Sequence, residues 1–258
     1  MNISYNILKE INENIISIWK KYPGITERIP LLYTKLKTDS LLFIGNNPSF
    51  IIKGVSARIR SSEEFIKYWD DPVSLFNYSK FDDCLQDYYL YLSKGRNSVM
   101  NGDSQYFNIF NKISDIIGIE WEHIDLYYIF NTSQKEIEKI VSRNTNFFDE
   151  QAEITVKLIR HLNPKMIVIG NASSGYVLWK LLNLKFDKSI GTYLYKYNEK
   201  EIPVFISSML TGQRALDVES RIRLIWHIDY VCKLMNIEKD IIESNWDKLQ
   251  PRENWVIE

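Results

Sequence analysis

The chain has 258 residues, with 32 basic and 33 acidic side chains and a formal net charge of −1. Dedicated non-specific nucleic-acid binders are strongly basic, and this near-neutral balance argues against that class of protein. The two cysteines, Cys84 and Cys232, stand far apart, so we expect buried, reduced thiols rather than a disulfide framework or an iron–sulfur cluster. No signal peptide and no run of about 20 apolar residues is found, so we expect a cytoplasmic protein that does not enter a membrane.

The chain begins with an amphipathic pattern. Leu8, Ile11, Ile15 and Trp19 recur at three- to four-residue steps, which predicts a helix, and the breaker pair Pro23-Gly24 ends it. We therefore expect an N-terminal helical extension over residues 1–38. Residues 51–108, which hold a cluster of Tyr and Asp, predict a helical insertion after the first strand.

Four continuous apolar runs predict strands buried on both faces. They lie at residues 41–44, 124–130, 166–169 and 203–206. Helical spacing follows the second, third and fourth runs, and residues 193–202 predict a hairpin that leads into the fourth strand. The alternation predicts an α/β fold, a three-layer α/β/α sandwich with a short, mainly parallel four-stranded central sheet. No linker divides the chain, so we expect a single domain over residues 1–258.

Ligands of open parallel sheets bind beyond the carboxyl ends of the strands. Here these ends are residues 45–50, 131–134, 170–173 and 207–216. They are rich in amides and hydroxyls and contain neither Cys nor His, which argues against a metal site and against a Cys–His or Ser–His nucleophile. Amides offer both a donor and an acceptor, so the pattern suits recognition of a neutral polar ring without metal or cofactor.

The first strand and its Gly45-Asn46-Asn47-Pro48-Ser49 end resemble the first motif of the uracil-DNA glycosylase superfamily. The closest pattern is the G-x-N-P branch, which includes mismatch-specific and single-strand-selective types. Asn131, which closes the second strand, is similar to an Asn that pairs with the extruded base in this superfamily. The stretch from Leu162 through Gly170 to Ala172 resembles a third family segment, so the resemblance covers residues 40 to 230 in order.

The resemblance implies roles for individual residues. Asn47 would orient the attacking water, and Asn131 would read the edge of the base. Phe50 would stack on the base, and Gly45 and Pro48 would complete the base-binding group. The implied fold is the family's α/β fold, and the implied partner is uracil-containing or single-stranded DNA.

The chain departs from the family at the fourth strand, where the usual motif is His-Pro-Ser. It reads Ser207-Ser208-Met209 instead and has no histidine there. Loss of a charge-stabilising donor at such a position costs about 3 kcal/mol of transition-state energy. We consider Ser208, with Gln213 or Arg214 as alternatives, as the catalytic substitute, and Gln213, Arg214 and Leu216 as contacts to DNA.

Each of these residues also has a plain structural interpretation. Asn47 could be a turn residue before Pro48, and Asn131 a helix cap or turn residue. Phe50 could belong to the core, and Arg214 to a surface ion pair. The leading hypothesis is a DNA glycosylase-like enzyme that removes uracil or another deaminated or damaged base. The alternatives are a non-catalytic nucleic-acid or nucleotide-binding module, and an enzyme of the same fold that acts on another nucleobase conjugate.

Overall fold

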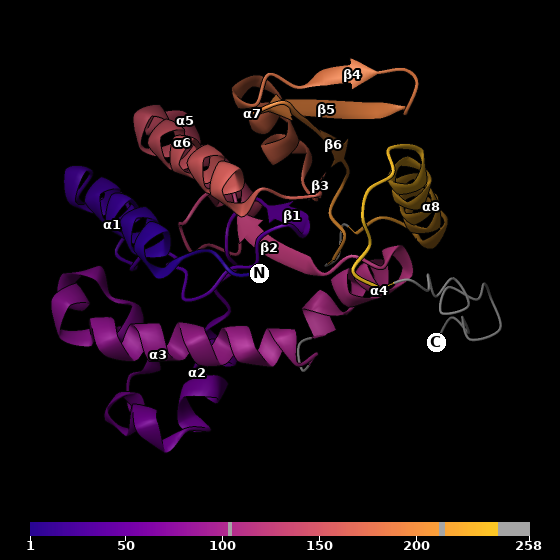
Figure 1. Ribbon diagram of the computed structural model, residues 1–258. Coiled ribbons are helices and arrows are strands. Elements are labelled where there is room, and N and C mark those ends of the chain that lie inside the picture. The colour runs from indigo at the N-terminus through magenta and orange to yellow at the C-terminus, as the bar shows by residue number, and fades with distance from the viewer. Residues whose placement is uncertain (103–104, 212–214, 242–258) are drawn as a thin grey trace. The chain divides into compact units, whose positions relative to one another are not determined.

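The computed structural model (Figure 1) describes residues 1–102, 105–211 and 215–241 of the chain. These residues belong to two compact units. Unit 1 is formed by residues 1–36, 45–101 and 125–161, and unit 2 by residues 37–44, 102–124 and 162–258. The single domain expected over residues 1–258 stays a prediction.

Unit 1 is helical. Its elements are α1 (Tyr5–Lys21), α2 (Ile52–Arg60), the 3-10 helices η1 (Glu63–Tyr68), η2 (Pro72–Phe76) and η3 (Tyr78–Lys80), α3 (Phe81–Met100), α5 (Gln134–Arg143) and α6 (Thr145–Leu162). Within residues 1–38 the helix is α1, and residues 22–38 are irregular, whereas most of residues 52–100 are helical; the N-terminal extension and the insertion stay predictions. Ser4 caps α1 by accepting a hydrogen bond from the Ile7 amide at 3.4 Å. The predicted apolar stripe of α1 is its buried face.

Unit 2 contains the sheet. Among the described residues six strands pair in the order β2-β1-β3-β6-β5-β4. Their bounds are β1 (Leu41–Gly45), β2 (Trp121–Asp125), β3 (Met166–Ile169), β4 (Lys185–Asp187), β5 (Thr192–Tyr197) and β6 (Lys200–Ile206). The pairs β1–β3 and β3–β6 are parallel, whereas β4–β5 and β5–β6 are antiparallel. The expected α/β class is confirmed, but the expected four-stranded, mainly parallel sheet is wrong: the sheet is mixed and has six strands.

Helices cover both faces of this sheet (Figure 1). The unit holds η4 (Gln105–Phe107), α4 (Asn108–Ile117), α7 (Ala172–Leu181) and α8 (Val218–Leu234). Phe205 and Ile206 are consecutive in β6, so their side chains point to opposite faces. The Phe205 ring contacts His227 of α8 at 5.2 Å, and Ile206 packs on Gly175 of α7, where an added Cβ would lie 2.5 Å from an Ile206 methyl carbon. α7 and α8 therefore lie on opposite faces.

The second strand lies earlier than predicted. The sequence indicated residues 124–130, but β2 ends at Asp125, and the apolar residues that follow are buried without belonging to a strand. The Leu126 amide still donates to the carbonyl of Gly45, the last residue of β1, but the next two amides leave the sheet. The Tyr127 amide donates to the Asn46 carbonyl, and the Tyr128 amide donates to the Gln151 side chain at 2.8 Å. Burial alone therefore does not identify a strand.

The predicted hairpin is confirmed. β5 pairs with β6 in antiparallel register from Tyr193↔Val204 to Tyr197↔Lys200. The two turn residues, Asn198 and Glu199, both have positive φ, at 47° and 64°. This geometry is typical of the two-residue turns that match the twist of a hairpin.

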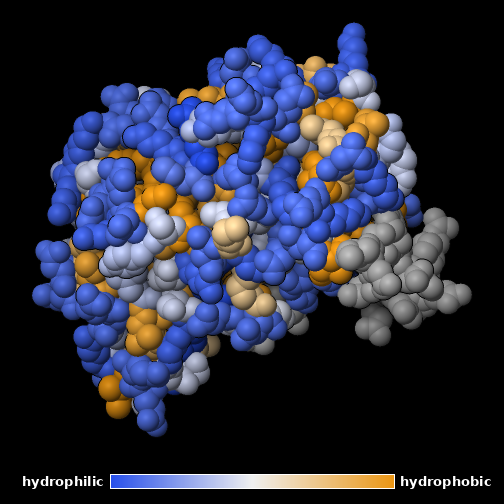
Figure 2. All heavy atoms as spheres, viewed as in Figure 1, coloured by the Kyte–Doolittle hydropathy of each residue, from blue (hydrophilic) through white to orange (hydrophobic). Residues whose placement is uncertain are grey.

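Both cysteines are buried and form no disulfide, as predicted. None of the helices in the described ranges combines the length and the apolar character needed to cross a bilayer. On the face shown in Figure 2, hydrophilic residues predominate and hydrophobic residues form several separate patches.

Candidate functional site

Asn47 joins two loops of unit 1. Its Nδ2 group donates to the backbone carbonyl of Asn131 at 2.6 Å, and the Ile129 and Pro48 carbonyls lie 3.3 and 3.2 Å from the same nitrogen. Oδ1 accepts a hydrogen bond from Asn46 Nδ2 at 3.0 Å. The half-buried amide is thus fixed in orientation, and one lone pair of its carbonyl oxygen has no donor among the described residues.

Asn131 lies beside it, in the turn that precedes helix α5. Its Oδ1 atom accepts from the Ser133 amide at 2.8 Å, and its Nδ2 group donates to Glu136 at 3.2 Å. Ser133 caps α5 by accepting from the Glu136 amide, so the S-x-x-E sequence forms the first half of a capping box. The turn role foreseen for Asn131 is therefore present. Within the part of the chain that the structure describes, one N–H hydrogen and one lone pair of its amide have no partner.

Phe50 is buried, with 6% of its surface exposed. Its ring contacts Phe76 and Phe130 at 5.0 and 6.0 Å, so it packs in the core as the structural interpretation expected. Thr132, which the sequence did not single out, holds the same loop: its hydroxyl donates to the Phe50 carbonyl and accepts from the Phe50 amide, at 2.8 and 3.0 Å. The stacking role predicted for Phe50 stays a prediction.

Arg28 is a second residue that the sequence did not single out. Its guanidinium group lies over the Phe50 ring, 4.3 Å from the centroid, and Nη1 donates to the Phe130 carbonyl at 3.0 Å. Both loops of the site therefore hold this side chain. No local motif marks Arg28, because the contacts join residues far apart in sequence.

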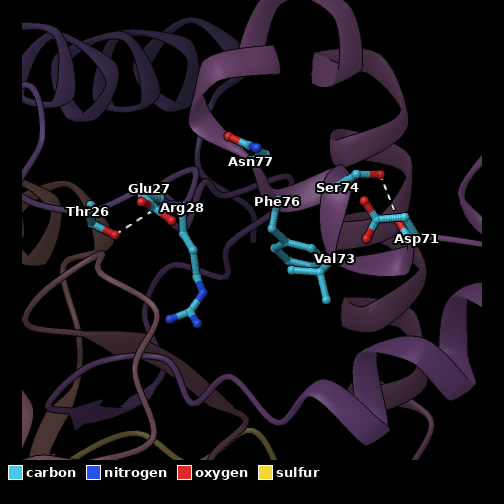
Figure 3. Close-up of a pocket in the computed structure, with 8 residues that line it drawn as sticks. All are labelled: Thr26, Glu27, Arg28, Asp71, Val73, Ser74, Phe76 and Asn77. Atoms are coloured by element: carbon cyan, nitrogen blue, oxygen red, sulfur yellow. Dashed lines mark hydrogen bonds between the residues drawn. The ribbon is translucent and has the colours of Figure 1, made fainter.

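Arg28 also lines a pocket of about 320 Å³ within unit 1 (Figure 3). The lining residues are Thr26, Glu27, Arg28, Asp71, Val73, Ser74, Phe76 and Asn77. Two backbone hydrogen bonds, Ile29 N to Phe76 O and Tyr78 N to Glu27 O, tie the two contributing segments at 2.8 and 2.7 Å. Asn47 and Asn131 are not among the lining residues.

Asp125, at the end of β2, lies six residues before Asn131 in the chain. Burial raises the pKa of its carboxyl from 3.8 to about 7. Its backbone carbonyl lies 3.4 Å from the Thr155 hydroxyl of α6, and its amide lies 3.3 Å from the Tyr33 hydroxyl. The start of the Asn131 loop is therefore anchored in the helical core of unit 1.

The other predicted site residues contribute through their backbones, belong to unit 2 or lie outside the described residues. Gly45 accepts a hydrogen bond from the Leu126 amide at 3.1 Å, and Pro48 from the Asn131 amide at 3.0 Å, so both shape the loops through their backbones. Ser208 and Leu216 belong to unit 2, where Leu216 N donates to Met209 O at 2.8 Å. Gln213 and Arg214 lie outside the described residues, so their predicted contacts to DNA stay predictions.

Within the described ranges, no group of three or more His, Cys, Asp or Glu side chains is arranged as a metal site. No protein-family model matches the chain, and no curated protein matches it.

Proposed function

We propose that this protein is a DNA glycosylase-like enzyme that hydrolyses the N-glycosidic bond of uracil or of another deaminated or damaged base in DNA. The observation that carries the proposal is the 2.6 Å hydrogen bond from Asn47 Nδ2 to the Asn131 carbonyl. It supports the proposal because the two residues assigned to water and to base are neighbours, and both are half-exposed.

Asn47 is suited to orient a water molecule. Its Nδ2 hydrogens are committed to backbone carbonyls, and one lone pair of Oδ1 is committed to Asn46. The second lone pair is free to accept an O–H from the attacking water. An amide is a weak base, but a reaction in which the bond to the base breaks early needs an oriented nucleophile more than proton removal.

Asn131 is suited to read a base edge. In this proposal its second N–H donates to a carbonyl oxygen of the base, and the second lone pair of Oδ1 accepts a hydrogen bond from a ring N–H of the base. The departing base needs stabilisation that the family obtains from a histidine. This chain has Ser207-Ser208 at that position, so we expect slow turnover, and the catalytic role of Ser208 belongs to the proposal.

The test is a cleavage assay. Wild-type protein is incubated with a uracil-containing oligonucleotide, and alkali then converts abasic sites into strand breaks. We expect breaks from wild type and a loss of rate of about 100-fold in Asn47→Ala, because a water displaced by about 1 Å reacts that much more slowly. Asn6→Ala, on the exposed side of α1, is the control for handling.

Two results would count against this function. Breaks that persist at the wild-type rate in Asn47→Ala would refute the role of that residue, provided that both proteins unfold at the same temperature. An absence of breaks with uracil and with other deaminated bases, in single-stranded and in duplex substrates, would refute the enzyme.

A non-catalytic nucleic-acid or nucleotide-binding module is the second candidate. Both N–H hydrogens of Asn47 serve the protein's own backbone, which suits a residue that shapes a loop. For this candidate we expect binding to an oligonucleotide that weakens steeply with salt and is not followed by strand breaks.

A further inference from the structure

The Arg28 guanidinium group is held in place but is not neutralised. One face lies on the Phe50 ring, and Nη1 donates to the Phe130 carbonyl. Among the described residues, no carboxylate lies within ion-pair distance of Arg28, and the side chain is half-buried. One of its five N–H groups donates to Phe130, and the other four have no acceptor among the residues that the structure describes.

This cation faces the pocket. Figure 3 shows the Arg28 side chain extending from one side of the opening, with Phe76 and Val73 on the other side and Asp71 beyond them. The volume of about 320 Å³ is at the lower end of the range for small-molecule sites. Arg28 and Phe76 thus line the same pocket.

The polar groups of the pocket are of two kinds. The planar guanidinium matches the oxygen pairs of phosphate and carboxylate groups, and fixing it in advance lowers the entropy lost on binding. Glu27 and Asp71 add carboxylates, which accept hydrogen bonds and repel a bare anion. A fitting ligand therefore combines an oxyanion with hydroxyl or N–H donors. A nucleotide has this combination in its phosphate, sugar and base.

We propose that the Arg28 pocket binds a nucleotide through its phosphate group. The choice of a nucleotide rests on the proposed function, whereas the phosphate contact rests on Arg28 itself. The phosphate belongs either to a free mononucleotide or to the backbone of a DNA strand.

The test is a calorimetric titration of the full chain at low salt with four probes. These are deoxyuridine 5′-monophosphate, deoxyuridine, inorganic phosphate and a short uracil-containing single strand. We expect the nucleotide or the strand to bind at least about tenfold more tightly than deoxyuridine, because hydrogen bonds to a charged group are worth that factor. Binding of the strand without the mononucleotide assigns the backbone phosphate, and binding of the mononucleotide assigns the free ligand.

Three variants locate the contact. Arg28→Gln removes the charge but keeps a planar amide, and we expect the phosphate-dependent gain to disappear. Arg28→Lys keeps the charge but lacks the planar guanidinium group, and we expect it to lose part of the phosphate-dependent gain in affinity. Arg60→Ala is the matched control, because Arg60 also donates to a backbone carbonyl, that of Trp69 at 3.0 Å, but does not line the pocket.

Equal affinities of wild type and Arg28→Gln for the phosphate-bearing probes would overturn the proposal. So would equal affinities for deoxyuridine and its monophosphate, or inorganic phosphate binding as tightly as the nucleotide. The outcome is separable from the cleavage assay. Base release without phosphate-dependent binding overturns this inference alone. Phosphate-dependent binding without release of uracil or of any other deaminated base tested overturns the enzymatic function alone.

Discussion

Asp125 carries a carboxyl group that the protein keeps away from water. Burial raises its pKa from 3.8 to about 7, so the folded protein holds a proton there that the unfolded chain releases in weak acid. Between about pH 4 and pH 7 the folded state binds more protons at this residue than the unfolded state. The contribution of Asp125 to stability is therefore complete below pH 4 and is lost as the pH rises through 7.

We expect Asp125→Asn to raise the free energy of unfolding at pH 8 by about 2 to 4 kcal/mol relative to wild type, since one pKa unit corresponds to 1.36 kcal/mol. At pH 4 the two proteins should differ far less. Urea denaturation at both pH values measures the difference, and comparing the two proteins cancels the other titrating groups. An equal difference at pH 4 and at pH 8 would contradict a protonated Asp125.

At the scale of residues, the sequence identified the side chains that stand next to a recognisable local sequence pattern. Asn47 and Asn131 follow apolar runs, and the sequence predicted that both close strands. The two residues are neighbours, but Asn131 lies six residues beyond the end of β2 and not at a strand end. Arg28 was not expected, because it lies in an irregular segment and its partners, Phe50 and the Phe130 carbonyl, become neighbours only on folding. Local patterns identify the loops of a site but not the distant side chains that complete it.

Among the elements, the β5–β6 hairpin has a strained turn. Asn198 accepts a positive φ readily, but Glu199, with a φ of 64°, occupies a position that favours glycine. An L-residue with a Cβ in this conformation costs about 1 kcal/mol. The hairpin is thus formed in spite of its turn, through the pairing of its strands.

We expect Glu199→Gly to stabilise the protein by about 0.5 kcal/mol, because relief of the strain exceeds the added entropy of the unfolded chain. Glu199→Ala is the matched control: it removes the same carboxylate but keeps a Cβ, so no gain is expected. Midpoints of urea unfolding measure both. A gain of equal size in the alanine variant would assign the effect to charge and not to backbone geometry.

The helices and the long apolar strands were predictable because their periodicity is local. β4 was not, since Lys185–Asp187 is short and lies at the edge of the sheet. The second strand was placed too late because residues 126–130 are as apolar as a strand. Their amides donate to the last carbonyl of β1, to the Asn46 carbonyl and to Gln151, and no pattern within the run shows this.

On the scale of the whole molecule, the chain passes between the two units five times. Neither unit is a continuous piece of sequence. The sheet of unit 2 takes β1 from the first fifth of the chain, β2 from the middle and the other strands from residues 166–206. Each unit therefore depends on segments that a simple truncation would separate.

We expect the fragment of residues 162–258 to remain unfolded when produced alone. It contains β3 to β6 but lacks β1, so the buried strand β3 loses its parallel partner on one side. Circular dichroism during heating and amide NMR dispersion report the outcome, with the full chain as reference. A cooperative thermal transition in the fragment would show that these strands fold independently of β1.

The register that pairs Leu41 with Met166 also has a consequence for biosynthesis. The two residues are separated by about 125 positions, which a ribosome needs roughly 6 to 25 s to translate at 5–20 residues per second. During that interval the apolar strand Leu41–Ile44 has left the tunnel while β3 does not yet exist. The nascent chain therefore exposes an unpaired apolar strand, which is prone to aggregate, for many seconds. We expect expression at low temperature, with co-expressed chaperones, to raise the yield of folded protein.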